Sequence, residues 1–228
     1  MTSFLVRFKK GNMQKSMIEG NTLKLILNFS IPLLLGNLFQ QFYNVVDAAI
    51  VGQTLGSKAL AAVGASSSVQ FLILGFCMGI CQGFAIMVSQ SYGAKRPDEM
   101  HTYIYAGAVW TAITAFVVSI FVVVFCADIL HILQVNDEIF NDAYAYLVVI
   151  FLGIPFTLLY NYLSAILRAI GDSKTPLIAV GIACVFNIIG DLFFVAVLHL
   201  GASGAAIATV IAQLISVDRY ELCPCRLV

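Results

Sequence analysis

Residues 60–90 read LAAVGASSSVQFLILGFCMGICQGFAIMVSQ and contain no charged side chain. A helix needs about 20 predominantly apolar residues to cross the hydrocarbon core of a bilayer, so this stretch is long enough to span a membrane. The whole chain has the same character, because 61% of its 228 residues are hydrophobic and 11% are charged. Soluble domains carry about 45–50% apolar and about 25% charged residues. This composition excludes a soluble enzyme and favours an integral membrane protein.

The hydropathy predicts an all-α integral membrane protein with six spans and short loops. We expect spans at about 23–49, 60–90, 102–126, 143–168, 177–198 and 202–217, between a tail at 1–22 and a tail at 218–228. Polar or turn-forming residues separate the spans at 52–58, 93–100, 128–142, 171–176 and 199–201. Pro32 and Pro155 predict bends early in the first span and within the fourth.

The basic residues predict the orientation of these spans. Of the 12 Lys and Arg residues, only Lys58 falls on one side, where Asp128, Asp137, Glu138 and Asp142 also lie. The positive-inside rule therefore predicts a multi-pass protein of the plasma (inner) membrane with both termini in the cytoplasm. A net charge of zero offers phosphates no basic field, which excludes a nucleic-acid partner. No metalloprotease motif or serine nucleophile elbow occurs, so we expect no enzymatic activity.

Two carboxylates are predicted inside apolar runs, namely Asp47 in the first span and Asp191 in the fifth. A carboxylate at the centre of a bilayer costs about 2.5–3.5 kcal/mol on insertion scales, so an intramembrane acid is a functional hypothesis by default. The alternative is that each residue reaches water near the end of its helix. This alternative is stronger for Asp47, because the first span ends a few residues later.

Polar residues recur at three and four positions along several spans and so form one face on each helix. They are Asn37, Gln40, Gln41, Asn44 and Asp47 in the first span, Thr157, Tyr160, Asn161, Ser164 and Arg168 in the fourth, Asn187 and Asp191 in the fifth, and Thr209, Gln213 and Ser216 in the sixth. Several polar faces cannot all point to lipid, so we expect them to converge on a shared interior. That interior is either hydrogen-bonded contact between helices or the lining of a cavity, and contact alone does not require two carboxylates.

These residues belong to longer motifs. The first motif runs from Ile31-Pro32 through NVVDAAIVG at 44–52 to LG at 55–56 and ALAAVG at 59–64. The others are SQSYGAK at 89–95, RAIGDSKTP at 168–176 and NIIGD at 187–191. In combination they resemble the multidrug and toxic compound extrusion (MATE) transporters over about residues 20–217, in the bacterial branch with an aspartate in the first and fifth helices.

The resemblance implies a cation-coupled antiporter of twelve helices in two lobes, which exports drugs or other organic, often cationic, compounds. It implies an Na⁺ or H⁺ site at Asp47, Asn187, Asp191 and Thr209, with Tyr43 adjoining, and no other cofactor. Na⁺ prefers carboxylate, amide and hydroxyl oxygens, which these residues supply. Two aspartates in one dry cavity repel each other, so a proton could replace the metal ion. The candidate substrate-binding residues are Asn37, Gln40, Gln41, Tyr43, Asn44, Asn161 and Ser164.

The chain differs from the family by matching one lobe, the N-terminal one, and by ending in VDRYELCPCRLV at 217–228, which continues no family pattern. Alternating access needs two bundles that move against each other. We therefore expect transport to require a separately made second lobe or a homodimer. Two alternatives remain open, namely a lipid-linked sugar flippase, which predicts a larger and more basic cavity, and a non-transporting, truncated membrane protein.

Overall fold

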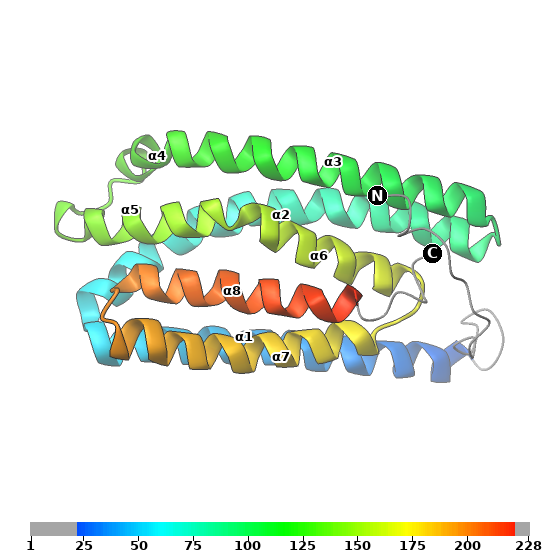
Figure 1. The fold of residues 1–228 in the computed structure, drawn as a ribbon, viewed down its shortest axis with the longest axis horizontal. Coiled ribbons are helices and arrows are strands. Elements are labelled where there is room, and N and C mark those ends of the chain that lie inside the picture. The colour runs from blue at the N-terminus through cyan, green and yellow to red at the C-terminus, as the bar shows by residue number, and fades with distance from the viewer. Residues whose placement is uncertain (1–21, 222–228) are drawn as a thin grey trace.

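The computed structural model describes residues 22–221, and within that range the chain is helical without strands. The helices are α1 (Thr22–Leu55), α2 (Ser57–Gly93), α3 (Pro97–Val124), α4 (Cys126–Ile132), α5 (Asp137–Leu152), α6 (Ile154–Ala169), α7 (Lys174–Asp191), the π-helix η1 (Leu192–Val197) and α8 (Ala202–Glu221). They form an elongated bundle of roughly parallel and antiparallel helices (Figure 1). The helix α7 packs against both α1 and α8, and α2 packs against α3, α5 and α6.

The long helices have the length and composition of membrane spans. Four helical segments are individually long and apolar enough to cross a membrane, namely Leu23–Leu55, Ser57–Gly93, Pro97–Val124 and Lys174–Val197. Asp137–Leu152 and Ile154–Ala169 together pass as one bent span, at the position of the predicted fourth span, and Ala202–Val217 is a shorter apolar helix. The predicted all-α membrane bundle is therefore confirmed for the described residues.

The outer surface of the bundle is apolar. On α3, Trp110 and Phe116 are 57% and 60% exposed, and many aliphatic side chains on α1 are similarly uncovered. Exposed apolar surface this extensive is not found on soluble monomers, whereas lipid is its natural solvent. The best-packed core lies where α2, α3, α5 and α6 meet, and it includes Leu147, Phe151, Leu158 and Ile166.

The segment predicted as a loop at 128–142 is mostly helical. It contains most of α4 and the start of α5 at Asp137. Asn136 caps α5, since its side chain accepts a hydrogen bond of 3.0 Å from the backbone N–H of Glu138. Acidic residues are favourable in the first turn of a helix because they oppose the helix dipole. Hydropathy recognises only the apolar part of such a helix, so it does not mark these polar first turns.

The fourth span is broken at Gly153, where the axes of α5 and α6 differ by 49°. Pro155 lies in the first turn of α6, where its missing N–H costs no hydrogen bond. Ser119 on α3 donates a hydrogen bond of 2.6 Å to the carbonyl oxygen of Phe151 at the break. Neighbouring hydroxyls commonly satisfy backbone groups that a break inside a membrane helix releases. By contrast, α1 continues through Pro32 as one helix.

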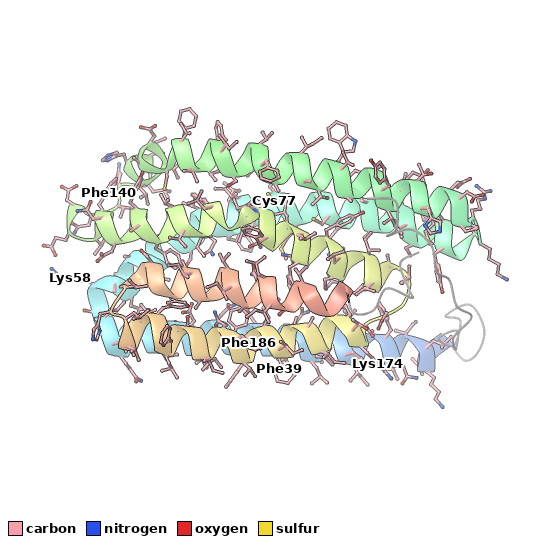
Figure 2. The ribbon with its side chains drawn as sticks, viewed as in Figure 1. Phe39, Lys58, Cys77, Phe140, Lys174 and Phe186 are labelled. Atoms are coloured by element: carbon pink, nitrogen blue, oxygen red, sulfur yellow. The ribbon has the colours of Figure 1, made fainter. Side chains whose placement is uncertain are left out.

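The two ends of the bundle carry different charges. Lys58 lies at one end and Lys174 at the other (Figure 2). The Lys58 Nζ atom is 2.9 Å from Oε2 of Glu138, so this ion pair joins the start of α2 to the start of α5. Lys95 and Arg96 lie in the α2–α3 loop, at the same end as Lys174 (Figure 1). The basic residues thus lie mainly at one end of the described helices.

Candidate functional site

The polar face predicted on α1 divides into two parts. Gln40 and Asp47, with the neighbouring Tyr43, are half-buried, whereas Gln41 and Asn44 are exposed and join each other through a hydrogen bond of 3.1 Å from Asn44 Nδ2 to Gln41 Oε1. Asn37 of the predicted face is exposed as well. At 100° per residue, the three half-buried side chains fall within about 60° of one another, and Gln41 and Asn44 lie on the adjacent surface. Gln41 and Asn44 therefore face away from the interior of this bundle, in contrast to the single converging face that we expected.

Asn187 and Asp191 lie one turn apart on α7 and are buried, with 2% and 0% of their surfaces exposed. The Nδ2 atom of Asn187 donates a hydrogen bond of 3.0 Å to Oγ1 of Thr209 on α8. The Thr209 hydroxyl in turn donates to the carbonyl oxygen of Ala205 over 3.1 Å. These bonds fix the Asn187 amide and the Thr209 hydroxyl relative to each other.

Asp47 on α1 meets Asp191 on α7 in this interior. Their carboxyl groups lie close enough to form a hydrogen bond when one of them carries a proton. Two ionised carboxylates at this separation repel each other strongly, because little water is present to screen them. A proton or another cation between the two carboxylates would relieve this repulsion.

Four buried acceptor oxygens at this point have no hydrogen-bond partner among the described residues: Asp47 Oδ1, Asn187 Oδ1, and both Oδ1 and Oδ2 of Asp191. A buried acceptor without a partner costs about 1–3 kcal/mol, so a cluster of four requires a compensating interaction. A hard cation supplies one, since it binds carboxylate and amide oxygens directly. The residues present thus fit a small cation.

The ligand types distinguish this cluster from a transition-metal site. Residues 22–221 contain no group of three or more His, Cys, Asp or Glu side chains that could hold a metal ion. The cluster offers two carboxylates, an amide and a hydroxyl instead, and it has no soft ligand. Such an oxygen-only set suits Na⁺ or a proton.

Tyr43 and Tyr146 lie beside the two aspartates. Each is close enough to interact electrostatically with both carboxylates. The Tyr43 hydroxyl interacts with Gln40, and the Tyr146 hydroxyl interacts with Gln70 on α2. Tyr146 and Gln70 cannot be selected from the sequence, because a tyrosine in an apolar helix is indistinguishable from a core residue. The one available signal was that a buried tyrosine hydroxyl needs a polar partner.

Two neighbouring cavities lie between Asn187 and Thr209 of this cluster and the remaining polar residues, and neither cavity is lined by Asp47 or Asp191. The smaller, of about 20 Å³, has Gln40, Tyr43, Asn187, Thr209 and Gln213 among its lining residues. The larger, of about 190 Å³, is lined in part by Asn37, Gln40, Gln82, Asn161, Ser164 and Arg168. Gln40, Tyr160 and Val180 line both cavities. The structure thus brings the candidate residues of α1, α6, α7 and α8 together, apart from Gln41 and Asn44.

A family comparison agrees with this geometry. The model of the family described as MatE matches residues 32–193, which include Asp47 and Asp191. The chain belongs to the MatE family. The MatE match also covers Asn161, Ser164 and Asn187, whereas Thr209 lies beyond it.

Individual relatives support the same assignment. The "Probable multidrug resistance protein YpnP" of Bacillus subtilis (strain 168) is 34% identical over 197 residues, which cover 86% of this chain and 44% of the relative. The "Multidrug export protein MepA" of Staphylococcus aureus (strain NCTC 8325 / PS 47) is 26% identical over 191 residues, which cover 83% of this chain and 42% of the relative. The MatE chain thus spans less than half the length of these two relatives.

The fold agrees with solved MATE transporters. A structure described as the outward-facing conformation of a multidrug resistance MATE family transporter superposes with a TM-score of 0.86 at 24% identity. The superposition covers 92% of this MatE chain and 47% of the solved chain. The described bundle therefore corresponds to about one half, or one lobe, of that transporter.

Proposed function

We propose that this chain forms the N-terminal lobe of a cation-coupled antiporter that exports drugs or other organic compounds from the cell. The observation that carries the proposal is the cluster of four unpartnered oxygens on Asp47, Asn187 and Asp191. Membership of the MatE family supports transport, and several relatives are named as multidrug resistance or export proteins. The coupling ion is Na⁺ or H⁺, held by Asp47, Asn187, Asp191 and Thr209.

The proposed mechanism is the exchange of positive charges. When the site lacks its cation, the Asp47 and Asp191 carboxylates make the interior negative, which favours a cationic organic substrate in the adjoining cavity. Binding of Na⁺ or H⁺ neutralises one of the two negative charges, so the substrate loses part of its electrostatic attraction and dissociates. Coupling requires the cation to bind one conformation of the lobe more tightly than the other.

Polar side chains in the larger cavity would bind the uncharged polar groups of the substrate. Gln40, Asn161 and Ser164 line this cavity together with apolar residues such as Leu33, Met78 and Leu177. Binding sites for small molecules combine mainly apolar walls with a few polar groups that fix orientation. A volume of about 190 Å³ holds only part of a drug-sized ligand, so the rest of the site would come from a second lobe.

A second six-helix bundle is part of the proposal. Alternating access in transporters depends on two bundles that move against each other. This chain spans 44% of one relative and 47% of one solved MATE transporter. The other bundle would be a C-terminal lobe or a second copy of this chain.

The charge distribution supports an orientation. Lys95, Arg96 and Lys174 lie at the end of the bundle opposite Lys58. The positive-inside rule assigns that end to the cytoplasm, and both tails would then be cytoplasmic in a multi-pass plasma membrane protein.

A lipid-linked sugar flippase is the second candidate function, because Arg168 lines the larger cavity. A pyrophosphate-linked substrate would call for several basic groups to balance its charge. Arg168 is the one charged residue among the residues that line the two cavities. One basic group is fewer than a pyrophosphate-linked substrate would require, so this lining disfavours the flippase.

The proposal is tested by ion-dependent dye efflux from cells that produce the chain with and without a C-terminal MATE lobe. We expect efflux driven by a Na⁺ or H⁺ gradient only when both lobes are present. Asp191→Asn should abolish the ion dependence while membrane insertion stays intact. Unimpaired ion-driven efflux by that variant would refute the proposed site.

A further inference from the structure

The helices α7 and α8 touch each other at Gly190. A Cβ atom at position 190 would lie 2.9 Å from the Cβ of Ala208 and 3.4 Å from its Cα. A separation below 3.0 Å between Cβ atoms essentially never occurs, so any larger residue would force the two helices apart. Small residues at such a crossing allow helix backbones in a membrane to approach closely.

This contact adjoins three of the proposed cation ligands. Gly190 directly precedes Asp191 on α7, and Ala208 directly precedes Thr209 on α8. Asn187 lies three residues before Gly190, on the neighbouring helical position, and donates its hydrogen bond of 3.0 Å to Thr209. The point where the helices touch is therefore the point where their polar side chains meet.

A second glycine, one turn before Ala208 on α8, also allows a close approach between backbones. A Cβ atom at Gly204 would lie 3.1 Å from the backbone C and O atoms of Phe194. Phe194 belongs to η1, the π-helical segment that begins directly after Asp191. Gly204 precedes Ala205, whose carbonyl oxygen accepts the Thr209 hydroxyl proton over 3.1 Å. Both glycine contacts therefore lie beside the hydrogen-bonded chain from Asn187 to Ala205.

The orientation of the Asn187 amide follows from this spacing. Because Nδ2 is bonded to Thr209, the amide presents Oδ1, which is one of the four oxygens without a partner. If α8 moved away by a few tenths of an ångström, the bond would weaken and the amide could rotate. The site would then lose an acceptor oxygen and would present N–H donors to a cation.

We infer that Gly190 is a positioning residue for the cation site, with Gly204 acting in the same way from α8. Neither glycine contacts the ion. Each allows the close approach of α7 and α8 that keeps the Asn187 and Thr209 oxygens in place. The inference rests on the proposed function, since it assumes that the oxygen cluster binds Na⁺ or H⁺.

The test uses the purified chain in lipid nanodiscs and needs no transport. A hydrophobic carbodiimide labels protonated carboxyl groups in apolar surroundings, and mass spectrometry measures the labelling of Asp47 and Asp191. The labelling rate is measured against Na⁺ concentration, with choline keeping the ionic strength constant, and separately against pH. The variants are Gly190→Ala, the control Gly181→Ala, and Gly190→Ala combined with Ala208→Gly. Gly181 is a matched control because it lies on the same helix with nothing within 4 Å of its would-be Cβ.

We expect Gly190→Ala to raise the Na⁺ concentration for half-protection by about tenfold or more, as for other residues that orient metal ligands. If H⁺ is the coupling ion, the pH midpoint of labelling should shift instead. Gly181→Ala should match the wild type, and Ala208→Gly should restore the Gly190→Ala protein by recreating the gap. If Gly190→Ala does not fold, Gly204→Ala carries the same expectation, because its contact is less severe.

The outcomes separate the two hypotheses. If the wild type shows neither protection by Na⁺ nor labelling that depends on pH, the cation site itself is wrong. If the wild type responds but the folded Gly190→Ala protein gives the same curves, the inference about Gly190 is overturned. It is also overturned if Ala208→Gly fails to restore the response.

Discussion

The amide nitrogen of Asn187 lies 3.0 Å from the hydroxyl oxygen of Thr209 and donates a hydrogen bond that joins α7 to α8. The same amide keeps its oxygen free of any partner among the described residues. One side chain thus holds two helices together and offers an acceptor to the interior. Its neighbour Asp191 adds two further free oxygens.

Replacement of Thr209 by Val should weaken cation binding by about 10- to 100-fold, because it removes the partner that orients Asn187. Thr209→Ser keeps the hydroxyl and should retain binding close to that of the wild type. Calorimetric titration of the purified proteins with Na⁺ provides the measurement. Equal affinities for the Val and Ser variants would show that the hydroxyl has no role.

Lowering the pH should weaken Na⁺ binding, since a proton competes for the Asp47–Asp191 pair. One competing proton changes the apparent affinity by at most about tenfold per pH unit. Asp191→Asn leaves a single carboxylate, so this pH dependence should largely disappear along with tight binding. The control Asp142→Asn changes an exposed acid on α5 and should leave both properties intact. If lowering the pH weakens Na⁺ binding to Asp191→Asn as much as to the wild type, the proton does not compete at the Asp47–Asp191 pair.

Ser119→Ala should lower the free energy of unfolding by about 1 kcal/mol or more, because it leaves the Phe151 carbonyl at the break without its donor. Ser67→Ala serves as the control. Ser67 is exposed, and its hydroxyl bonds only the Val63 carbonyl of its own helix. Thermal unfolding in detergent should therefore distinguish the two variants, and equal melting temperatures would refute a stabilising role for Ser119.

Gly153→Ala should destabilise the protein by about 1–3 kcal/mol, as overpacked cores do. Its new Cβ atom would overlap the Cγ2 atom of Val210 on α8. Shortening Val210 to Ala in the same protein should recover part of the loss. Gly75→Ala is a matched control, since nothing lies within 4 Å of that position. A penalty of the same size at Gly75 would mean that steric overlap is not the cause.

Cysteine labelling should establish the orientation of the bundle. In a protein whose Cys223 and Cys225 are changed to Ser, we expect an impermeant thiol reagent to reach Lys58→Cys from outside intact cells and to reach Lys95→Cys only after lysis. The described cysteines at 77, 81, 126 and 184 are buried and should stay unlabelled. The opposite labelling pattern would invert the assigned orientation.

The Lys58→Cys change also removes the Lys58–Glu138 ion pair. Its loss should lower the free energy of unfolding by at most about 1 kcal/mol, because the two side chains are 71% and 66% exposed.

The helical membrane fold was predictable because long apolar runs have few alternatives in a bilayer. The positions at which the regular helices break were harder to predict from the sequence. The bend occurs at Gly153, where Val210 and Ser119 from distant parts of the chain fit against the backbone. The π-helical turn after Asp191 likewise depends on packing against Gly204. Hydropathy carries no information about such contacts between helices.

Part of the candidate site was predictable from helical periodicity. Asp47, Asn187, Asp191 and Thr209 stood out because polar groups are costly in lipid. Periodicity could not say which edge of the polar face on α1 turns inward, so Gln41 and Asn44 were grouped with Gln40. Tyr146 was not predictable because its polar partner, Gln70, lies on another helix. The contribution of a tyrosine hydroxyl depends on neighbours that only the fold brings together.

The π-helical turn at Leu192–Val197 has a consequence for how the end of the fifth span tolerates change. Each hydrogen-bonded ring in a π-helix encloses one residue more than a ring in an α-helix. Deletion of a single residue within this turn could therefore be absorbed by tightening it to ordinary α-helix. The direction of Asp191, which lies before the turn, would be preserved. The same deletion between Asn187 and Asp191 would instead rotate Asp191 away from Asp47.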